Sequence, residues 1–444
     1  MKQILELRDK KIYQLFWQYT LPSVAGTLVL AIYYMIDSAF IGYGPHLGDH
    51  ALGALGVLLP VMNLLGSLGT LAGVGTSSRI SIYLGLGDKE TAMQIMGTSL
   101  LFTFVISIIP ISLIYLFMEP ILYWMGATDE TYLFARDFLG YYLPASLFLN
   151  MGTTLTHIMK ATGYPKKALY IMALSVVFNV VLAPLFIFVF KWGMKGAGGA
   201  TLLATLLSAC IIIPHFQGEK TLFPARLKLR FKILFQILNI GFAPFLITAM
   251  TSLIVFCVNR QLIAYSNSVS LEGYLIASRF HYVFIMIFVG ISQGIQPIIG
   301  YNFGAGNYTR MFQALHYAFK VALGVGFVAL LAGIFASREM VQIFNPSPGL
   351  IEEASKALFV LTVTLPLAGC QMLIGGFFQH IGIAAKSAAI SLARIAFLIP
   401  LIYLLPLCWG VNGVWASLPL AEVLVCLTGY IVFYFQKKQM AGGK

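Results

Sequence analysis

The sequence predicts an all-α integral membrane protein with about twelve transmembrane helices, arranged as two pseudo-symmetric six-helix lobes around a central cleft. Three observations lead to this prediction. Of the 444 residues, 59% are hydrophobic and only 10% are charged, which is more apolar surface than a soluble globular protein needs. Apolar runs of about 20 residues or more, long enough to cross the hydrocarbon core of a bilayer, recur along the chain. The second half of the sequence also repeats the first.

The apolar runs are separated by polar or Gly/Pro-containing breaks and define the expected membrane spans. They lack the short alternating segments of a transmembrane β-barrel. The expected spans are residues 13–42, 51–78, 92–118, 131–158, 167–190, 197–216, 233–264, 273–300, 311–336, 356–381, 387–408 and 413–435.

The charged residues predict how these spans are oriented. Basic residues gather at alternate span ends, and acidic residues mark the opposite ends. The basic ends include Lys10, Lys11, Lys166, Lys167, Arg310, Lys437 and Lys438, and the acidic ends include Glu119, Asp129, Glu130, Glu352 and Glu353. By the positive-inside rule, both termini lie in the cytoplasm of a multi-pass inner-membrane protein. The net charge of +12 therefore reflects membrane topology, and no nucleic-acid partner is expected. The amphipathic N-terminal segment lacks the features of a secretory signal and is expected to lie along the cytoplasmic interface.

Four segments of the first half match four segments of the second half in order. The pairs are IYQLFWQYTLPSVAG with LFQILNIGFAPFLIT, YLGLGDKETAMQ with NFGAGNYTRMFQ, MKATGYPKKA with QHIGIAAKSA, and WGMKGAGGA with WGVNGVWAS, and their separation along the chain is nearly constant. We expect an N-terminal lobe over residues 1–216, a basic cytoplasmic linker over 217–232 and a C-terminal lobe over 233–444. Two such lobes, related by a pseudo-two-fold axis along the membrane normal, suit alternating access.

Several motifs resemble those of the multidrug and toxic compound extrusion (MATE) family, and the resemblance covers nearly the whole chain. They are LPSVAGTLVLAIYYMIDSAFIG at 21–42, GVGTSSRISIYLGLGD at 73–88, WGMKGAGGAT at 192–201 and GYNFGAG at 300–306. Bacterial drug-efflux members close to the DinF-like branch are the most similar. The NorM-like branch is less similar because it keeps acidic residues in the seventh and tenth spans, where this chain has Asn259, Arg260 and Gln371. The resemblance implies a monomeric secondary exporter.

Asp37 is a carboxylate about two thirds of the way through the first apolar run. A charged side chain near the bilayer centre costs roughly 3 kcal/mol or more by insertion scales, so Asp37 is expected to face the protein interior and to have a function. Burial disfavours the charged form of a carboxylate, which suits Asp37 to bind and release a proton as a cavity opens and closes. The alternative is a buried Asp that only ties helices together by hydrogen bonds.

The expected partners of Asp37 are Tyr33, one helical turn earlier, and Asn179 and Thr201, which match family positions around this carboxylate. The family pattern Asn-x-x-Leu-Asp-Pro reads NVVLAP here, so Ala183 replaces a second carboxylate. A metal cation prefers several oxygen ligands including carboxylates. We therefore expect H⁺ as the coupling ion, with Na⁺ as the alternative, and no other cofactor or metal.

The second lobe has a neutral residue, Asn259, at the position that the repeat pairs with Asp37, so coupling is expected in the first lobe alone. Basic side chains nevertheless occur in or beside apolar runs of the second lobe. They are Arg260, Arg279, Arg394, His281 and His380. The arginines are expected to pair with backbone carbonyls or to reach an interface. The alternative is a surface that binds anionic substrates or lipid phosphates.

Aromatic, Met and amide side chains near the middle of the spans form the expected substrate surface. Aromatic and Met side chains adapt to flat hydrophobic compounds, and amides orient them. The candidates are Tyr34, Met35, Asn63, Phe148, Asn150, Met151, Thr153, Asn259, Arg260 and Gln293. For each of them the alternative is ordinary contact with lipid or with the protein core.

Two functions remain open at this point. The first is a secondary active exporter of amphiphilic cationic or zwitterionic compounds, and the second is a flippase or exporter of an anionic or lipid-linked precursor. Nothing in the sequence supports an enzyme, since it has no HExxH motif, catalytic triad or paired acids. LGLGD and FGAGN lack the preceding strand and the GK[ST] of a phosphate-binding loop, so tight turns are expected there.

Overall fold

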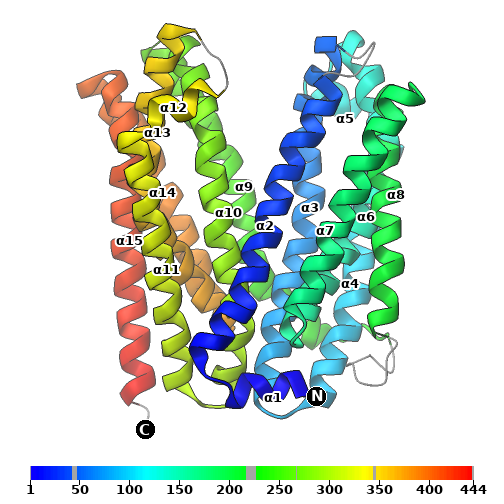
Figure 1. Cartoon of the computed structure of the whole chain (residues 1–444), viewed down its shortest axis with the longest axis vertical. Helices are drawn as coiled ribbons and strands as arrows, with labels where there is room; N and C mark the ends of the chain where they lie inside the picture. Colours follow the sequence, from blue (N-terminus) through cyan, green and yellow to red (C-terminus); the bar gives the residue numbers. More distant parts are fainter. Residues whose placement is uncertain (1, 43–47, 217–226, 267, 344–346, 443–444) are drawn as a thin grey trace. The chain divides into compact units, whose positions relative to one another are not determined.

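The computed structural model of the chain describes residues 2–42, 48–216, 227–266, 268–343 and 347–442, which are helical almost throughout and contain no strand (Figure 1). Each expected span coincides with a long helix, the fifth with α7 and the π-helix η1 together. The helices are α1 Lys2–Asp9, α2 Ile12–Gly42, α3 Gly48–Gly85, α4 Lys89–Leu116, α5 Met118–Trp124, α6 Asp129–Ala161, α7 Pro165–Pro184, η1 Leu185–Val189, α8 Gly193–Phe216, α9 Phe231–Tyr265, α10 Ser268–Gly304, α11 Tyr308–Phe335, α12 Ser337–Gln342, α13 Pro348–His380, α14 Ala384–Trp409 and α15 Val411–Gly442.

Eleven of the helices in the described residues are long and apolar enough to cross a membrane. The remaining expected span, 131–158, coincides with α6, whose 33 residues are also long enough for a crossing. Its polar side chains, among them Asn150, Thr154 and His157, are buried inside the protein. α6 therefore differs from the other long helices in its polar content and not in its length. The chain is a multi-pass membrane protein.

The chain divides into two compact units. Unit 1 comprises residues 1–10 and 25–245, and unit 2 comprises 11–24 and 246–444. The divisions inside α2 and α9 therefore fall within two residues after Pro22 and Pro244, and a proline removes a helical hydrogen bond and permits a bend. The first half of α2 thus belongs to unit 2 and the first half of α9 to unit 1, which is the reverse of the lobes expected from the sequence. The expected linker 217–232 lies partly outside the described residues, and its role as a boundary stays a prediction.

The two units repeat one another in detail. In unit 1, α6 packs against α3, α4 and α8, and in unit 2, α13 packs against α10, α11 and α15. Six of the glycines with positive φ form three repeat-related pairs at helix ends: Gly87 (81°) with Gly306 (70°), Gly163 (100°) with Gly382 (79°), and Gly193 (56°) with Gly410 (57°). Side chains disfavour this conformation, so glycine is required. The tight turns expected in LGLGD and FGAGN are confirmed.

Glycines also allow the exchanged half-helices to pack closely within each unit. A Cβ atom on Gly75 of α3 would lie 2.2 Å from the backbone oxygen of Ile237, in the first half of α9. In unit 2, a Cβ atom on Gly294 of α10 would lie 2.5 Å from the Cα atom of Thr20, in the first half of α2. Small residues let helix backbones approach in a membrane, where packing replaces the hydrophobic drive to associate. Gly75 and Gly294 occupy corresponding positions of the repeat, so both copies conserve this contact.

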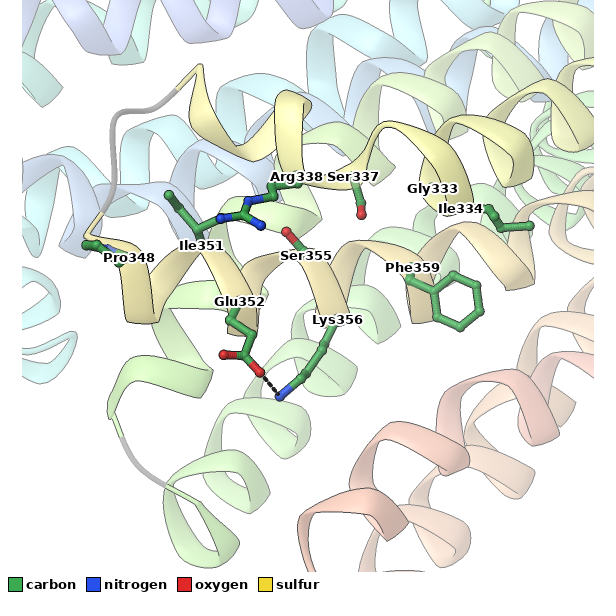
Figure 2. Close-up of a pocket in the computed structure, with 10 residues that line it drawn as sticks. All are labelled: Gly333, Ile334, Ser337, Arg338, Pro348, Ile351, Glu352, Ser355, Lys356 and Phe359. Atoms are coloured by element: carbon green, nitrogen blue, oxygen red, sulfur yellow. Dashed lines mark ion pairs between the residues drawn. The ribbon is translucent and has the colours of Figure 1, made fainter.

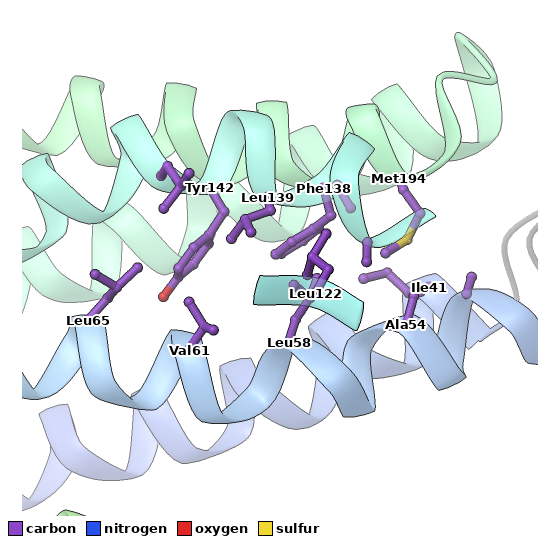
Figure 3. Packing of buried hydrophobic residues seen from close by; sticks show 14 of the residues in the cluster. Ile41, Ala54, Leu58, Val61, Leu65, Leu122, Phe138, Leu139, Tyr142 and Met194 are labelled. Atoms are coloured by element: carbon purple, nitrogen blue, oxygen red, sulfur yellow. The ribbon is translucent and has the colours of Figure 1, made fainter. Parts of the chain in front are cut away.

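A buried apolar cluster forms the core of unit 1 (Figure 3). Ala54, Leu58, Val61 and Leu65 recur along one face of α3 at the helical period. They face the rings of α6, among which Phe138 and Tyr142 stack with centroids 5.5 Å apart. The same cluster includes Ile41 near the end of α2 and Ala183 near the end of α7. It therefore fixes the part of α2 that follows Asp37.

Candidate ion-coupling site

Asp37 lies in the second half of α2, within unit 1. Its carboxylate oxygen Oδ1 is buried and has no hydrogen-bond partner among the described residues. A buried, ionised oxygen without a partner is costly. The carboxyl group is therefore placed to hold a proton or a cation. Among the residues that the structure describes, no group of three or more His, Cys, Asp or Glu side chains is arranged to hold a metal ion.

Asn179 and Thr201 meet between α7 and α8, whereas their expected place around Asp37 stays a prediction. The Asn179 Nδ2 atom donates a hydrogen bond to the Thr201 hydroxyl over 3.1 Å, and that hydroxyl donates to the backbone oxygen of Ala197 over 3.2 Å. These bonds orient the amide of Asn179. Its Oδ1 atom is buried and, within the described part of the chain, unpartnered. Asp37 Oδ1 on α2 and Asn179 Oδ1 on α7 are therefore both buried acceptor oxygens to which no described residue donates.

The helices that carry these two oxygens lie side by side. A Cβ atom on Gly26 of α2 would meet the side chain of Met172 on α7 at 2.1 Å. Further along, the ring of Phe40 on α2 packs edge-on against that of Phe188 in η1, with centroids 6.4 Å apart.

Each of these two oxygens belongs to a residue one turn before a member of the buried cluster of unit 1. Asp37 stands one turn before Ile41, and Asn179 stands one turn before Ala183. Ile41 and Ala183 belong to the same buried cluster (Figure 3). Tyr33 is half-buried on α2, one turn before Asp37.

The expected substrate residues of unit 1 differ in how they are used. Both ends of the Asn150 amide bond inside the protein: the backbone N–H of Gly69 donates to Oδ1 over 3.2 Å, and Nδ2 donates to the Ser107 hydroxyl over 3.0 Å. The Thr153 hydroxyl donates to the backbone of its own helix, at Leu149, over 2.8 Å. The Asn150 bonds tie α6 to α3 and α4 and occupy both ends of its amide, whereas the Thr153 bond stays within α6.

The other expected substrate residues of unit 1 are more open. Phe148 and Met151 are half-buried on α6, and Asn63 is exposed on α3. The side chains of Tyr34 and Met35 lie outside the described part of the structure. Whether this group contacts substrate stays a prediction.

In unit 2, Asn259 has a buried Oδ1 atom without a partner among the described residues, and Arg260 beside it is exposed. Gln293 is half-buried on α10. Arg279 is exposed on the same helix. These residues remain candidates within their own unit.

Arg394 and Glu422 form an ion pair between α14 and α15 that the sequence analysis missed. Arg394 was expected to pair with carbonyls or to reach an interface, whereas it contacts a carboxylate whose side chain is only 5% exposed. The signal was present in the sequence, because Glu422 interrupts the apolar run 413–435 as Asp37 interrupts the first. Asp37 is therefore not the only carboxylate at membrane depth.

A cavity of about 510 Å³ opens at one end of unit 2, beside α11, α12 and α13 (Figure 2). Lys356 and Glu352 form an ion pair of 3.0 Å at its wall. Its lining consists of Gly333, Ile334, Ser337, Arg338, Pro348, Ile351, Glu352, Ser355, Lys356 and Phe359. None of the residues predicted to bind substrate or ion belongs to this lining, so the cavity is separate from the candidate site.

Comparison with known proteins completes the description. The profile of the MatE family matches the chain twice, over residues 22–185 and 240–404, which is once per repeat. The multidrug export protein MepA of Staphylococcus aureus (strain NCTC 8325 / PS 47) is 27% identical over 444 residues, covering 99% of this chain and 97% of that protein. MepA of Staphylococcus haemolyticus (strain JCSC1435) is 26% identical over 446 residues, covering 100% and 98%.

Solved structures show the same fold. The outward-facing conformation of a multidrug resistance MATE family transporter of the MOP superfamily superposes with a TM-score of 0.92 at 22% identity, covering 99% of each chain. A MOP superfamily transporter from Pyrococcus furiosus Vc1 (DSM3638) superposes with a TM-score of 0.91, also at 22% identity and with 99% of each chain covered.

Proposed function

The chain belongs to the MatE family, and from this premise we propose that it exports amphiphilic cationic or zwitterionic compounds across the cytoplasmic membrane in exchange for protons. The two family matches and the full-length similarity to the MepA proteins support an exporter. Those relatives are named multidrug export proteins, and this supports a broad substrate range. The positive-inside pattern supports cytoplasmic termini.

The observation that carries proton coupling is the pair of unpartnered oxygens on α2 and α7. An ionised Asp37 and the Asn179 Oδ1 atom are both acceptors, so they cannot bond to each other. A proton on Asp37 makes its carboxyl group a donor, and the acceptor on the neighbouring helix is the Asn179 oxygen that Thr201 orients. We propose that in one state of the cycle the protonated carboxyl donates to this oxygen and satisfies both buried groups, and that loss of the proton removes this tie between α2 and α7.

The export cycle follows from this switch. In the outward-facing state, Asp37 binds a proton from outside and substrate leaves. In the inward-facing state, the proton passes to the cytoplasm and the compound to be exported binds. Pro22 stands within two residues of the point where α2 passes from unit 2 to unit 1. A bend at this point transmits the state of Asp37 to the first half of the helix.

The site is poor in ligands for sodium. Ala183, at the place of the family's second carboxylate, is fully buried in the apolar cluster. Besides Asp37, this leaves an amide oxygen and a hydroxyl, fewer oxygens than hard cations usually collect. Sodium coupling is the alternative to the proposed proton coupling.

The second candidate function is export or flipping of an anionic or lipid-linked precursor. Its support is the exposed positive charge of Arg260 and Arg279 in unit 2. The pairing of Arg394 with Glu422 removes one of the three arginines on which that alternative relied. Cationic and zwitterionic substrates are therefore favoured.

The test is transport of ethidium by the purified protein in liposomes, under an imposed pH gradient or an imposed sodium gradient. We expect the pH gradient alone to drive dye movement, and Asp37→Asn to abolish it. Asp137→Asn is the matched control, because Asp137 pairs with Lys195 at 3.8 Å on the surface and exposed pairs contribute little. Transport driven by sodium and insensitive to pH would exclude the proton. Movement of an anionic lipid analogue without dye movement would favour the second candidate.

A further inference from the structure

We propose that Glu422 is a second proton-binding carboxylate, located in unit 2, and that Arg394 controls when it is charged. The inference rests on the proposed proton-coupled export, and it adds a site on helices other than those that carry Asp37, Asn179 and Thr201. Its basis is the geometry of the Arg394–Glu422 pair and of the groups packed around it.

The pair lies deep within the membrane-spanning part of unit 2. Arg394 and Glu422 each lie several turns from both ends of their helices, Ala384–Trp409 and Val411–Gly442. Charged side chains at this depth are costly and mark functional sites. The Arg394 Nη2 atom contacts Glu422 Oε1, and the second carboxylate oxygen, Oε2, is buried without a partner among the described residues.

Glu422 and Arg394 differ in their freedom to move. The Glu422 side chain is 5% exposed, whereas that of Arg394 is 32% exposed. The carboxylate is therefore fixed in the interior, and the guanidinium is the partner that can withdraw. A buried carboxylate that loses its cation is strongly destabilised in its charged form. It then binds a proton from water at Oε2, which becomes an O–H group, and no other bond is made or broken at the carboxyl.

His281 on α10 has a neutral acceptor nitrogen. His281 is within electrostatic range of Arg394, and its ring bonds to the backbone oxygen of Leu361 on α13. Its Nδ1 atom is buried and, among the residues that the structure describes, without a partner. An imidazole that donates through one nitrogen accepts through the other. The proposal assigns His281 Nδ1 as the acceptor toward which Arg394 turns when it leaves Glu422 Oε1, and Glu422 is protonated in that arrangement.

The other titratable groups that face this cluster are neutral side chains. Tyr274 on α10 is within electrostatic range of Arg394 and packs against the ring of Trp415, with centroids 6.3 Å apart. Cys426 on α15 is within range of Glu422, and Cys370 on α13 is within range of Cys426. Uptake of one proton by Glu422 therefore changes the charge of the Arg394–Glu422 pair by one.

The place of this pair in the repeat supports a role in coupling. When WGMKGAGGA is aligned with WGVNGVWAS, Glu422 of α15 corresponds to Thr205 of α8, one turn after Thr201. The helix pair α14 and α15 is thus the counterpart of α7 and α8, which hold the amide and hydroxyl partners of Asp37. Glu422 lies on a helix of this pair itself, whereas Asp37 lies on α2, which contacts the corresponding pair in unit 1.

The experiment counts the protons released when ethidium binds to the purified full-length protein in weakly buffered detergent solution. We expect Glu422→Gln to release about half as many protons as the wild type, and Asp37→Asn to lose a similar share. The double variant releases none. Glu353→Gln is the matched control, because Glu353 pairs with Lys356 near the start of α13, and it keeps the wild-type number.

Arg394→Met is a second variant that tests the proposal if Glu422→Gln folds poorly. Without its cation, Glu422 stays protonated, so this variant loses the same share of released protons as Glu422→Gln, and combining the two changes causes no further loss. If all these variants released the wild-type number and only their unfolding temperatures fell, the pair would be structural and the proposal overturned. Absence of proton release from the wild type would overturn the proposed proton coupling itself.

Discussion

Unit 1 and unit 2 share one backbone plan but differ in the polar groups that this plan carries at membrane depth. Both units conserve the positive-φ glycines at helix ends and the close glycine contact to an exchanged half-helix. In unit 1 the interior holds Asp37 and the neutral pair Asn179–Thr201, whereas in unit 2 the corresponding helices hold Asn259 and the charged pair Arg394–Glu422. Duplication therefore preserved turns and packing, and it allowed the two copies to acquire different chemistry.

Exchange of the carboxylate between the units gives the largest expected effect. The variant Asp37→Asn/Asn259→Asp moves the acid to its repeat-related position, where Asn259 Oδ1 is also buried. We expect dye transport at the level of empty liposomes, because unit 2 has no counterpart of the Asn179–Thr201 pair to receive the proton. Recovery of proton-driven transport in this variant would show that the two units are chemically interchangeable. Asn259→Asp alone is the control for folding.

The glycine contacts give the next largest effect, and they should be equal in the two units. Replacing Gly75 or Gly294 by Leu drives a side chain into backbone atoms that a Cβ would already meet at 2.2 Å and 2.5 Å. Overpacking costs about 1–3 kcal/mol or more, so we expect a clearly lower unfolding temperature in detergent for both variants. Gly56→Leu and Gly324→Leu are matched controls, because a Cβ at either position meets nothing within 4 Å. Sensitivity at only one of the two contacts would break the equivalence of the units.

One helix contact is made by different means in the two units. In unit 1, Asn150 bonds to the backbone of Gly69, whereas at the repeat-related positions of unit 2 a Cβ on Gly369 would meet the ring of Phe288 at 2.9 Å. We expect Asn150→Ala to cost about 1–3 kcal/mol, because buried polar groups lose their partner, with dye affinity unchanged. Thermal unfolding and dye titration check this, and Asn63→Ala is the exposed control for the unfolding measurement alone. Weaker dye binding without loss of stability would instead place Asn150 in the substrate site.

The smallest effect concerns the caps of α4 and α11. Asp88 accepts hydrogen bonds from the Thr91 hydroxyl and the Thr91 backbone over 2.6 Å and 2.9 Å, and these bonds lower the pKa of Asp88 below its ordinary value of 3.8. The repeat-related cap is Asn307, which accepts from the Arg310 backbone over 3.3 Å and does not titrate.

A lowered folded pKa means that the Asp88 contribution is complete above the unfolded pKa and is lost as the pH falls through the folded one. We expect Asp88→Asn to leave stability near pH 7 unchanged and to reduce its decline below about pH 4. Unfolding temperatures measured across this pH range check the prediction. An equal decline in the wild type and the variant would contradict it.

The sequence was sufficient to predict the scaffold, because the features that determine it are local and periodic. Span lengths follow from apolar runs, and the positive-φ turns follow from glycines such as Gly87 and Gly306 in repeated motifs. The short helices α5 and α12 were not predicted, since a helix of seven or six residues at a span end has no periodic signal of its own. The exchange of half-helices at Pro22 and Pro244 depends on packing between distant segments, which sequence patterns do not encode.

The candidate site was predictable only in part, for a related reason. Asp37 is conspicuous because carboxylates are rare in apolar runs, and the family resemblance supplied Asn179 and Thr201. Glu422 also interrupts an apolar run, but a lone acid does not indicate a site until its partner is known. That partner, Arg394, lies on the preceding helix. The two hydrogen bonds of the Asn150 amide likewise depend on partners in other helices, which the sequence does not reveal.

The most direct test of the central claim, that Asp37 couples export to protons, is to run the cycle backwards. An outward-directed gradient of ethidium across sodium-free proteoliposomes should drive protons in the opposite direction, as followed by a pH-sensitive dye inside the vesicles. We predict proton movement with the wild type and with the Asp137→Asn control, and none with Asp37→Asn. Proton movement by Asp37→Asn equal to that of the wild type would contradict the account.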